Sequence, residues 1–543
     1  MLSGGPPAPP RHATLQRALA AAAQGPAGLT FVDARENERP LSFAELYSRA
    51  LRTAGALRER GIRRGDRVAI VLPTCVEFMD AFFGALLAGA VPVPLYPPVR
   101  LGRLEEFHKR TARMIEVSGA RLLLSDARIS KFLGVAVARA RPELGLRKVE
   151  QGQPYEDEGA PGDLALIQFS SGTTVDPKPV ALTQANVLAN VAAIQTIIPG
   201  DDAQGGVSWL PLYHDMGLIG CLLLAVARPG PLTLISPEVF LAKPALWLRA
   251  IARKRATISV APNFAYGLCL RRVRDDELQG VDLSCWRFAL NGAEPVAPSV
   301  LRRFAERFAP FGFDGRALMP VYGLSEASLA VTFTPAGRGP RTRAGARELA
   351  SVGAPLPGVD VEIRDGRIFV RGPSVMREYF GNPEATRAVL QDGWLDTGDL
   401  GFVEGGELFV SGRVKDVIVL RGKNHAPQEF EDALDGLEGV RPGCVAAVAL
   451  PTEGGEELAL LVEQTGPLPA ELVSARVVER TGVRPHEVHL LAPGTLPRTS
   501  SGKLRRTEAL RQLLAGSLRP PDKVTLLHLA REAARSMLAR KPR

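Results

Sequence analysis

The stretch Leu166-Ile167-Gln168-Phe169-Ser170-Ser171-Gly172-Thr173-Thr174-Val175-Asp176-Pro177-Lys178 joins an apolar strand to a hydroxyl-rich loop that ends on a lysine. The hydroxyls, among them those of Ser170, Thr173 and Thr174, and the backbone N–H groups can donate to phosphate oxygens, while Lys178 supplies a mobile positive charge. The loop lacks the GxxxxGK[ST] spacing of a Walker A motif, so it indicates a nucleotide without the usual P-loop architecture. A plain Ser/Thr/Gly turn is the alternative for this stretch alone.

Further motifs follow in order along the chain and favour the phosphate interpretation. They place single charged or aromatic side chains between small residues and turns, which suits close approach to a ligand. These motifs are WLPLYHDMG at 209–217, NGAEP at 291–295, VYGLSEA at 321–327, TGDL at 397–400, GRVKD at 412–416 and PRTSSGK at 497–503.

In this order the motifs resemble those of the adenylate-forming superfamily of acyl-CoA synthetases, luciferases and peptide-synthetase adenylation domains. The wording PLYHDMGLIG, NGAEPV and RGKNHAPQEFE is most similar to the fatty acyl-AMP ligase branch. The resemblance covers roughly residues 28–510 and implies ATP as cosubstrate and Mg²⁺ as cofactor.

Bulk properties exclude several classes of protein. The chain has 543 residues, 45% of them hydrophobic and 23% charged, which is typical of a soluble globular protein of two or three units. Its longest apolar run, residues 216–227, is too short to span a bilayer, and the Pro/Gly-rich start is not a signal peptide, so we expect a cytoplasmic protein. The five cysteines are scattered without CxxC spacing, which argues against disulfides and zinc.

The formal net charge of +9 does not indicate a nucleic-acid-binding protein, because arginine is dispersed and no basic stripe with interleaved aromatic residues occurs. Anionic ligands such as ATP, a phosphopantetheine thiol or an acidic carrier protein account for the charge equally well.

Buried strands are predicted at 164–169, 232–235, 257–260 and 287–290, and Ser42 with Glu45 three places on predicts the start of a helix.

Alternating strand-like and helix-like patterns predict an α/β fold, a large layered N-terminal domain with a β subdomain and a small mobile α+β lid. We expect a flexible lead over 1–27, an adenylate-forming domain over 28–411 with its β subdomain at about 350–411, and a lid domain over 412–515. Residues 516–543 form a basic amphipathic tail, which either docks on its own domain or binds a membrane or partner.

The resemblance assigns the nucleotide site. For the adenine it implies the segment Gly292, Ala293 and Glu294, whose small residues let the base approach the backbone. It also implies Tyr322 and Gly323, where the tyrosine offers a ring for stacking. For the ribose, Asp399 is suited to accept two hydroxyl hydrogen bonds, and Arg413 can reach the same sugar or its phosphate.

Joining a carboxylate to ATP brings two anions together, so positioning and electrostatics carry the chemistry. By resemblance, Glu326 binds Mg²⁺ and Ser325 lies near the α-phosphate, and His214 gates the acyl pocket, with a structural capping histidine as the alternative. Lys503 enters the site to bind developing negative charge, and an exposed loop lysine is its alternative.

A hinge at the domain junction is expected at Lys415 and Asp416, by resemblance. Rotation there would withdraw Lys503 and present another face of the lid for thiol attack, so that one site runs two half reactions. Two positions depart from the family's phosphate loop, Val175 and Pro179, since a β-branched residue resists positive φ and proline lacks an N–H.

Together these inferences predict a Mg²⁺-dependent ligase that activates a medium or long-chain fatty acid as acyl-AMP and passes it to a separate acyl carrier protein. Residues 216–227 and the segment 263–266 are expected to help line the acyl tunnel, or to be plain core. A fatty acyl-CoA synthetase, a non-catalytic nucleotide or acyl-adenylate binder, and an adenylating domain for amino or aryl acids remain alternatives.

Overall fold

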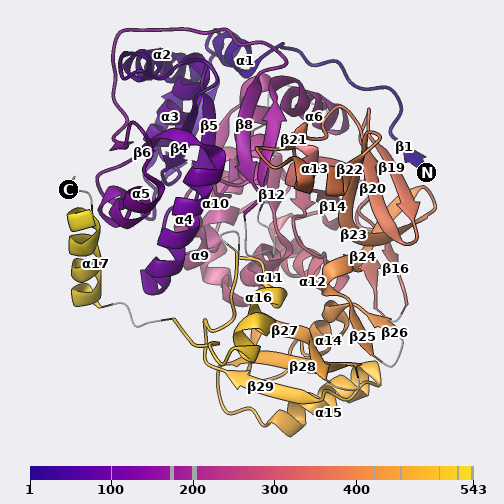
Figure 1. Ribbon diagram of the computed structural model, residues 1–543. Helices are drawn as coiled ribbons and strands as arrows, with labels where there is room; N and C mark the ends of the chain where they lie inside the picture. Colours follow the sequence, from indigo (N-terminus) through magenta and orange to yellow (C-terminus); the bar gives the residue numbers. More distant parts are fainter. Residues whose placement is uncertain are drawn as a thin grey trace.

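A nine-stranded mixed sheet forms the centre of the N-terminal part of the molecule (Figure 1). We describe a computed structural model over residues 1–98, 101–170, 177–198, 205–345, 347–420, 423–452, 455–499, 502–521 and 525–539. The inner strands of this sheet are parallel and its outer pairs antiparallel. In spatial order the strands are β18 (Ala354–Pro355), β15 (Ala330–Phe333), β14 (Leu318–Gly323), β13 (Phe288–Asn291), β12 (Ile258–Ala261), β10 (Gly206–Ser208), β11 (Leu232–Ile235), β2 (Gly28–Val32) and β3 (Glu38–Ser42).

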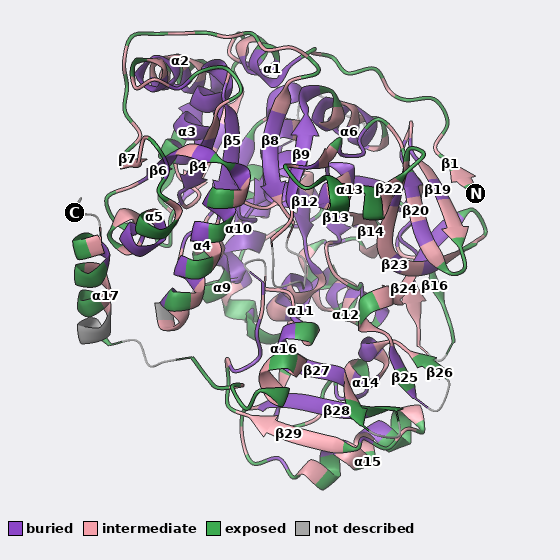
Figure 2. Cartoon of the chain, viewed as in Figure 1, coloured by how far each residue is buried: buried purple, intermediate pink, exposed green. Residues whose placement is uncertain are grey.

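A second, parallel sheet packs beside the first. Its order is β5 (Val91–Leu95), β4 (Arg67–Val71), β6 (Ala120–Ser125) and β7 (Leu146–Arg147). Buried helices separate the layers, as the purple interior in Figure 2 shows. The helices of this N-terminal part are α1 (Leu15–Ala22), α2 (Phe43–Glu59), α3 (Val76–Leu87), α4 (Leu104–Ser118), α5 (Gly134–Ala140), α6 (Gln184–Ile197), α7 (Asp215–Gly217), α8 (Leu224–Ala227), α9 (Pro237–Ala242), α10 (Ala245–Lys254), α11 (Asn263–Arg272) and α12 (Pro298–Phe308).

The predicted phosphate loop grows from an antiparallel hairpin. Strand β8 (Leu164–Phe169) pairs with β9 (Pro179–Thr183), and β21 (Glu378–Tyr379) adds to the other edge of β9. The amide of Ser170 donates to the carbonyl of Lys178 at 3.1 Å, which closes the base of the loop. Thr173, Thr174 and Val175 lie outside the described residues.

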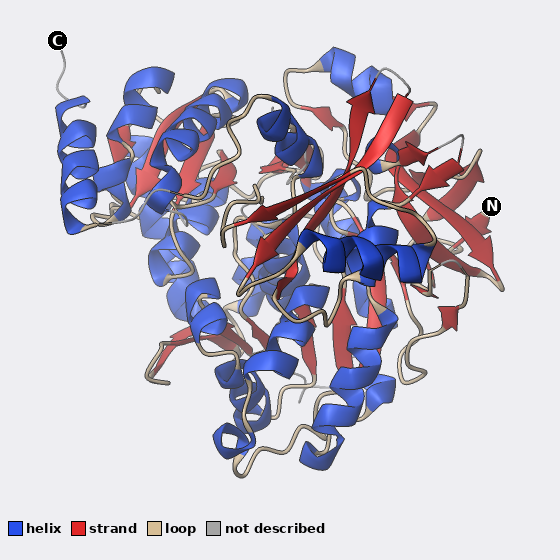
Figure 3. Ribbon diagram, turned by 90° about the horizontal axis from the view of Figure 1, so that it is seen from below, coloured by secondary structure: helices blue, strands red, loops and turns tan. Residues whose placement is uncertain are grey.

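The β subdomain follows, and after it comes a smaller unit. The subdomain sheet runs β1 (Leu2–Ser3), β19 (Asp360–Arg364), β20 (Arg367–Arg371), β23 (Trp394–Glu404) and β22 (Leu390–Gln391), with β24 (Glu407–Arg413) also paired to β23. A two-stranded ribbon, β16 (Thr342–Arg343) and β17 (Leu349–Ala350), and helix α13 (Pro383–Val389) complete this part. The mixed architecture confirms the predicted α/β fold class (Figure 3).

The smaller unit has its own apolar cluster, which begins at Ile418. It contains β25 (Ile418–Leu420), β26 (Lys423–His425), β27 (Val440–Thr452), β28 (Gly455–Gln464) and β29 (Glu487–Leu491), with helices α14 (Pro427–Ala433), α15 (Ala470–Thr481) and α16 (Arg506–Leu514). We call this unit the lid. The domain limits at 411/412 and 515/516 stay a proposal.

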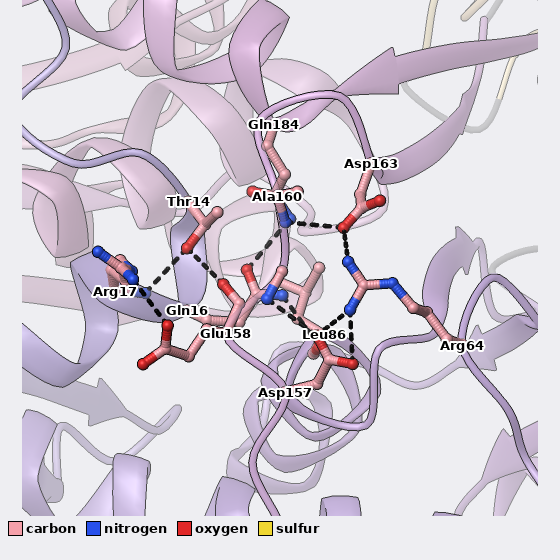
Figure 4. A network of polar contacts seen from close by, with 11 residues as sticks. Thr14, Gln16, Arg17, Arg64, Leu86, Asp157, Glu158, Ala160, Asp163 and Gln184 are labelled. Carbon is pink, nitrogen blue, oxygen red and sulfur yellow. Dashed lines mark hydrogen bonds and ion pairs between the residues drawn. The ribbon is translucent and has the colours of Figure 1, made fainter.

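The first 27 residues are built into the fold, where we predicted a flexible lead. Strand β1 pairs with β19, and helix α1 (Leu15–Ala22) packs in the main core with Leu15 and Leu19 fully buried. Polar contacts fix α1 further, as Figure 4 shows, because Thr14 donates to the carbonyl of Glu158 at 2.8 Å and Gln16 to that of Leu86 at 3.1 Å. The Pro/Gly-rich composition of the start concealed this short amphipathic helix.

The tail carries helix α17 (Leu526–Ala539), which lies against α5 of the N-terminal part (Figure 1). Ser536 is fully buried there, and its hydroxyl accepts a hydrogen bond from the amide of Gly134 at 2.5 Å. The tail is thus docked, but on the large domain and not on the lid that precedes it. Among the described residues, no helix is both long and apolar enough to cross a membrane.

Candidate active site

One large cavity, of about 1410 Å³, opens between the N-terminal part and the lid. Most of the residues predicted for the site line it. They are His214, Ser170, Ala293, Glu294, Tyr322, Gly323, Ser325, Glu326, Asp399, Arg413, Asp416 and Lys503. Gly292, Lys178 and Lys415 are not among the lining residues of the described chain.

Asp399 is the centre of a preorganised polar cluster. Strand pairing sets it opposite Arg413, whose Nε donates to Asp399 Oδ1 at 2.6 Å, and Tyr322 Oη donates to Asp399 Oδ2 at 2.7 Å. The carboxylate raises the pKa of Arg413 further, and burial with the nearby Asp399 charge raises that of Tyr322. The predicted ribose residues therefore meet, and Tyr322 orients the carboxylate as well as offering a ring.

His214 and Ser325 share a second buried carboxylate, that of Asp215. Nδ1 of His214 lies 2.6 Å from Asp215 Oδ1, and the hydroxyl of Ser325 donates to Oδ2. Although burial raises the pKa of Asp215, His214, Ser325 and Lys503 together hold it below its usual range. His214 is the N-cap of α7 and also lines the cavity, so the structural alternative and a position at the acyl pocket are compatible.

Glu326 and Lys178 meet through Tyr379. Tyr379 Oη donates to Glu326 Oε1 at 2.8 Å, and Lys178 Nζ lies 4.7 Å from the centre of the Tyr379 ring. Burial lowers the pKa of Lys178, Glu326 raises it, and Lys415 and Arg413 lower it. The hinge lysine predicted at 415 is thus within electrostatic reach of the phosphate-loop lysine.

The NGAEP segment is shaped by close packing. A side chain at Gly292 would press on Val321, with its Cβ 2.7 Å from Val321 Cγ2, and Ala293 has a left-handed backbone with φ of 67°. Glu294 accepts from the amide of Phe264 at 2.6 Å, near the start of α11, and burial raises its pKa. Glu294 thus caps a helix on the cavity wall.

Lys503 belongs to a loop that folds back on itself. The amide of Thr499 donates to the carbonyl of Lys503 at 2.8 Å, and the Lys503 amide donates to Thr499 Oγ1 at 3.0 Å. Burial lowers the pKa of Lys503, whereas Asp215, Glu294 and Asp399 raise it and Arg413 lowers it. The charge of Lys503 is thus felt by three carboxylates of the N-terminal part that line the same cavity.

Lys415 and Asp416, the residues predicted for the hinge, lie in a short turn at the junction. Asp416 Oδ2 accepts from Arg506 at 3.2 Å, and Arg506 also binds Glu431 at 2.6 Å, which ties the turn to two lid helices. Lys415 acts on the other side of the turn, where its charge helps to lower the pKa of Lys178. The two residues predicted for the hinge therefore interact with different partners, Asp416 with the lid and Lys415 with the N-terminal part.

The apolar side of the cavity includes part of the predicted acyl tunnel. Residues 218–223 form a π-helix, an irregularity that is frequent at functional sites. Gly220, Cys221 and Leu224 line the cavity, as does Phe264. Tyr266, predicted to help line the tunnel, is instead fully buried, and its hydroxyl donates to the carbonyl of Leu290 at 2.9 Å. Its position on the inner face of α11 explains the difference.

Comparison with known proteins agrees with this geometry. The profile of the AMP-binding enzyme family matches residues 19–380. The chain belongs to this AMP-binding enzyme family. A Caulobacter vibrioides protein with the provisional name acyl-CoA synthetase is 36% identical over 93% of this chain and 96% of its own length. The long-chain-fatty-acid–AMP ligase FadD32 of Mycolicibacterium smegmatis is 31% identical over 89% of this chain and 90% of its own length.

A solved structure from work on fatty acyl-adenylate ligases of E. coli and L. pneumophila superposes with a TM-score of 0.87 at 33% identity, over 93% of this chain and 98% of that one. This AMP-binding enzyme is therefore an adenylate-forming ligase, and the predicted resemblance is confirmed. Enzymes of this kind use ATP.

Sequence reasoning missed two residues of the AMP-binding enzyme's site: Asp215, which lines the cavity, and Tyr379, which is buried behind Glu326. Asp215 stands directly after His214 in the PLYHDMG motif, so its acidic character was a signal that could have been used. Tyr379 gave no signal, because its contact with Glu326 depends on pairing between β21 and β9, nearly 200 residues apart in sequence.

Proposed function

We propose that this enzyme activates a medium or long-chain fatty acid as acyl-AMP, releases pyrophosphate, and transfers the acyl group to an acyl carrier protein. The observation that carries the proposal is the position of Lys503, which the lid places on the wall of the cavity that Asp215, Glu294 and Asp399 also line. A preorganised cation there stabilises the negative charge that develops as carboxylate oxygen bonds to the α-phosphorus and pyrophosphate leaves.

The polar half of the cavity suits ATP and its apolar half suits an acyl chain. Asp399 and Arg413 would hold the ribose, Ser170 and Lys178 the departing phosphates, and the π-helix wall the chain. The medium to long chain length is supported by the apolar wall and by the name of the FadD32 relative.

Mg²⁺ fits this arrangement. Magnesium is usually bound by one or two carboxylates together with phosphates and water, and not by a cage of protein ligands. Among the described residues no group of three or more potential metal ligands occurs, and Glu326 presents a single carboxylate whose Oε1 is oriented by Tyr379. Glu326 would hold the ion, which would neutralise phosphate charge when bound.

The acceptor of the acyl group has two candidates. The segments PLYHDMGLIG and RGKNHAPQEFE favour a carrier protein, because they are most similar to the fatty acyl-AMP ligase branch. Coenzyme A is the second candidate, and the name of the Caulobacter relative favours it.

The test is purified enzyme with ATP, Mg²⁺ and a panel of fatty acids, with and without CoA or a phosphopantetheinylated carrier protein, analysed by mass spectrometry. We expect acyl-AMP that persists with CoA and is consumed by the carrier. Efficient formation of acyl-CoA would show that the acceptor of the acyl group is CoA and not a carrier protein.

Lys503→Ala supplies the catalytic control. Removal of one preorganised charge should lower acyl-AMP formation by about 10²–10³-fold. Lys148→Ala, at an exposed lysine, is the matched variant and should be unaffected. An unchanged rate in Lys503→Ala would contradict the catalytic role assigned to Lys503.

A further inference from the structure

Three arginines converge where helix α4 meets the lid. Arg103, Glu106 and Arg110 follow one another at spacings of three and four residues, so they share one face at the start of α4. Arg505 reaches them from the lid, and its Nη1 donates to Glu106 Oε1 at 3.0 Å. Arg103 and Arg110 lie 3.9 and 4.0 Å from the same carboxylate. We call Arg103, Arg110 and Arg505 the arginine cluster.

The arginine cluster carries more positive charge than its neighbours balance. Glu106 is the carboxylate that all three share, and the nearby Glu508 is paired with a fourth arginine, Arg511, at 2.6 Å. Arg505 is only 3% exposed. Burial and the charge of Arg110 lower the pKa of Arg505. Uncompensated buried charge is costly, so a bound anion would stabilise this arrangement.

Two members of the cluster have donors to spare. Within the described part of the chain, the buried Nε atoms of Arg110 and Arg505 have no hydrogen-bond partner. Arg103 differs, because its Nη2 donates to the carbonyls of Gly494 and Thr495 on the lid, at 3.4 and 3.1 Å. Arg103 therefore fastens the lid, whereas Arg110 and Arg505 can receive a ligand.

Two members of the cluster, Arg103 and Arg110, open on the same cavity as the base of the phosphate loop, and Arg505 lies buried behind them against Glu106. Arg103, Arg110, Tyr96 and Ser170 all line that cavity. Arg110 lies 5.7 Å from the centre of the Tyr96 ring, and Tyr96 in turn is 6.3 Å from the ring of Tyr213.

From there the connection continues to the loop itself. The carbonyl of Tyr213 accepts a hydrogen bond from Gln168, at 2.8 Å, on the strand that leads into Ser170. Arg505, meanwhile, is two residues from Lys503. A path of polar and aromatic contacts thus joins the arginine cluster to the place where phosphate would be handled.

We propose that Arg110 and Arg505 form a binding site for a phosphate anion, occupied by pyrophosphate after it leaves the phosphate loop. The proposal rests on the proposed function, which supplies the pyrophosphate. Guanidinium groups suit it because their planar forks bind phosphate oxygens through charge-assisted hydrogen bonds. Because Arg505 belongs to the lid and Arg110 to the N-terminal part, the site is complete only while the lid is closed. Opening of the lid would release the anion.

The test is a calorimetric titration of the full chain with sodium pyrophosphate and Mg²⁺. We expect Arg110→Ala and Arg505→Ala each to weaken binding about tenfold, which is the effect of losing one hydrogen bond to a charged group. Arg113→Ala is the matched control from the same helix, since the Arg113 side chain is half exposed and lies 3.8 Å from a different carboxylate, that of Glu116. Its affinity should equal that of the wild type.

Glu106→Gln separates an anion site from a simple docking contact. Removal of the competing carboxylate should leave pyrophosphate binding equal or tighter if the arginines hold the anion. If the arginines serve only to dock the lid, Glu106→Gln will weaken binding as much as Arg505→Ala does, and that result overturns the proposal. Arg110→Ala keeps the test decisive if Arg505→Ala fails to fold, which thermal unfolding will show.

Parallel titrations with 4′-phosphopantetheine distinguish the source of the phosphate. Sensitivity of phosphopantetheine, but not of pyrophosphate, to Arg110→Ala would overturn the pyrophosphate assignment. Acyl-AMP formation is measured separately. If the protein forms no acyl-AMP but binds pyrophosphate at Arg110 and Arg505, the proposed function is wrong and the anion site stands.

Discussion

Replacement of Asp215 by asparagine tests the buried carboxylate that unites three parts of the site. Asp215 is 5% exposed, and it accepts from the amide of Met216 at 2.7 Å as well as holding His214 and Ser325. Lys503 of the lid lies within its electrostatic reach. Asparagine keeps the size of the side chain but has no charge, and one of its two terminal groups becomes a donor.

The expected magnitude follows from the hydrogen bonds that asparagine cannot make. The amide oxygen of asparagine can still accept a hydrogen bond from the donors on one side of the former carboxylate. Its NH₂ group then faces the donor on the other side, which loses its acceptor. Removing one hydrogen bond to a charged group costs about 1.5–3 kcal/mol. If that cost acts in the transition state through His214 or Lys503, kcat/KM for acyl-AMP formation should fall about 10 to 150-fold.

The assay is kcat/KM for acyl-AMP formation, paired with chemical unfolding of both proteins as a function of pH. The pKa of Asp215 is depressed in the folded state, so its stabilising contribution is complete above the unfolded pKa and is lost as pH falls through the folded value. The stability difference between wild type and Asp215→Asn should therefore shrink as pH falls below about 4. Equal kcat/KM, or a stability difference that grows in acid, would refute the reasoning.

Two further substitutions probe backbone packing. Gly323→Ala should destabilise the enzyme by about 3 kcal/mol or more, since the new Cβ would collide with the carbonyl of Leu329. Gly162→Ala, which has open space around it, is the control and should leave the thermal unfolding midpoint unchanged. Gly134→Ala should undock α17, because its Cβ would collide with the carbonyl of Ser536, and hydrogen exchange should quicken over 526–539. Unchanged exchange there would show that α17 does not depend on this contact.

Strands were the part of the fold most accurately predicted. The strands expected at 164–169 and 232–235 are found with those limits, since runs of apolar β-formers between turn residues mark buried strands. The strands expected at 257–260 and 287–290 are each displaced by one residue, to Ile258–Ala261 and Phe288–Asn291. Such ends depend on the register with neighbouring strands, which no local pattern records.

The site was predicted as a set of motifs but not as a set of contacts. The spacing TGD and GRxKD brought out Asp399 and Arg413, which do pair. That Tyr322 donates to the same carboxylate could not be read from sequence, because it joins residues 77 positions apart. Ser42 was expected to open α2, and its hydroxyl does accept from the amide of Glu45 at 3.0 Å, since capping is a local interaction.

The docking of α17 on α5 fixes the far end of the segment that follows the lid, so the length of that segment limits how far the lid can move. Helix α16 ends at Leu514 and α17 begins at Leu526, and a fully extended chain between them can span roughly 40 Å. While Gly134 holds Ser536, the end of α16 can travel no farther than that from the start of α17. The predicted swing of Lys503 into and out of the cavity would therefore be limited by the docking of a helix on the N-terminal part.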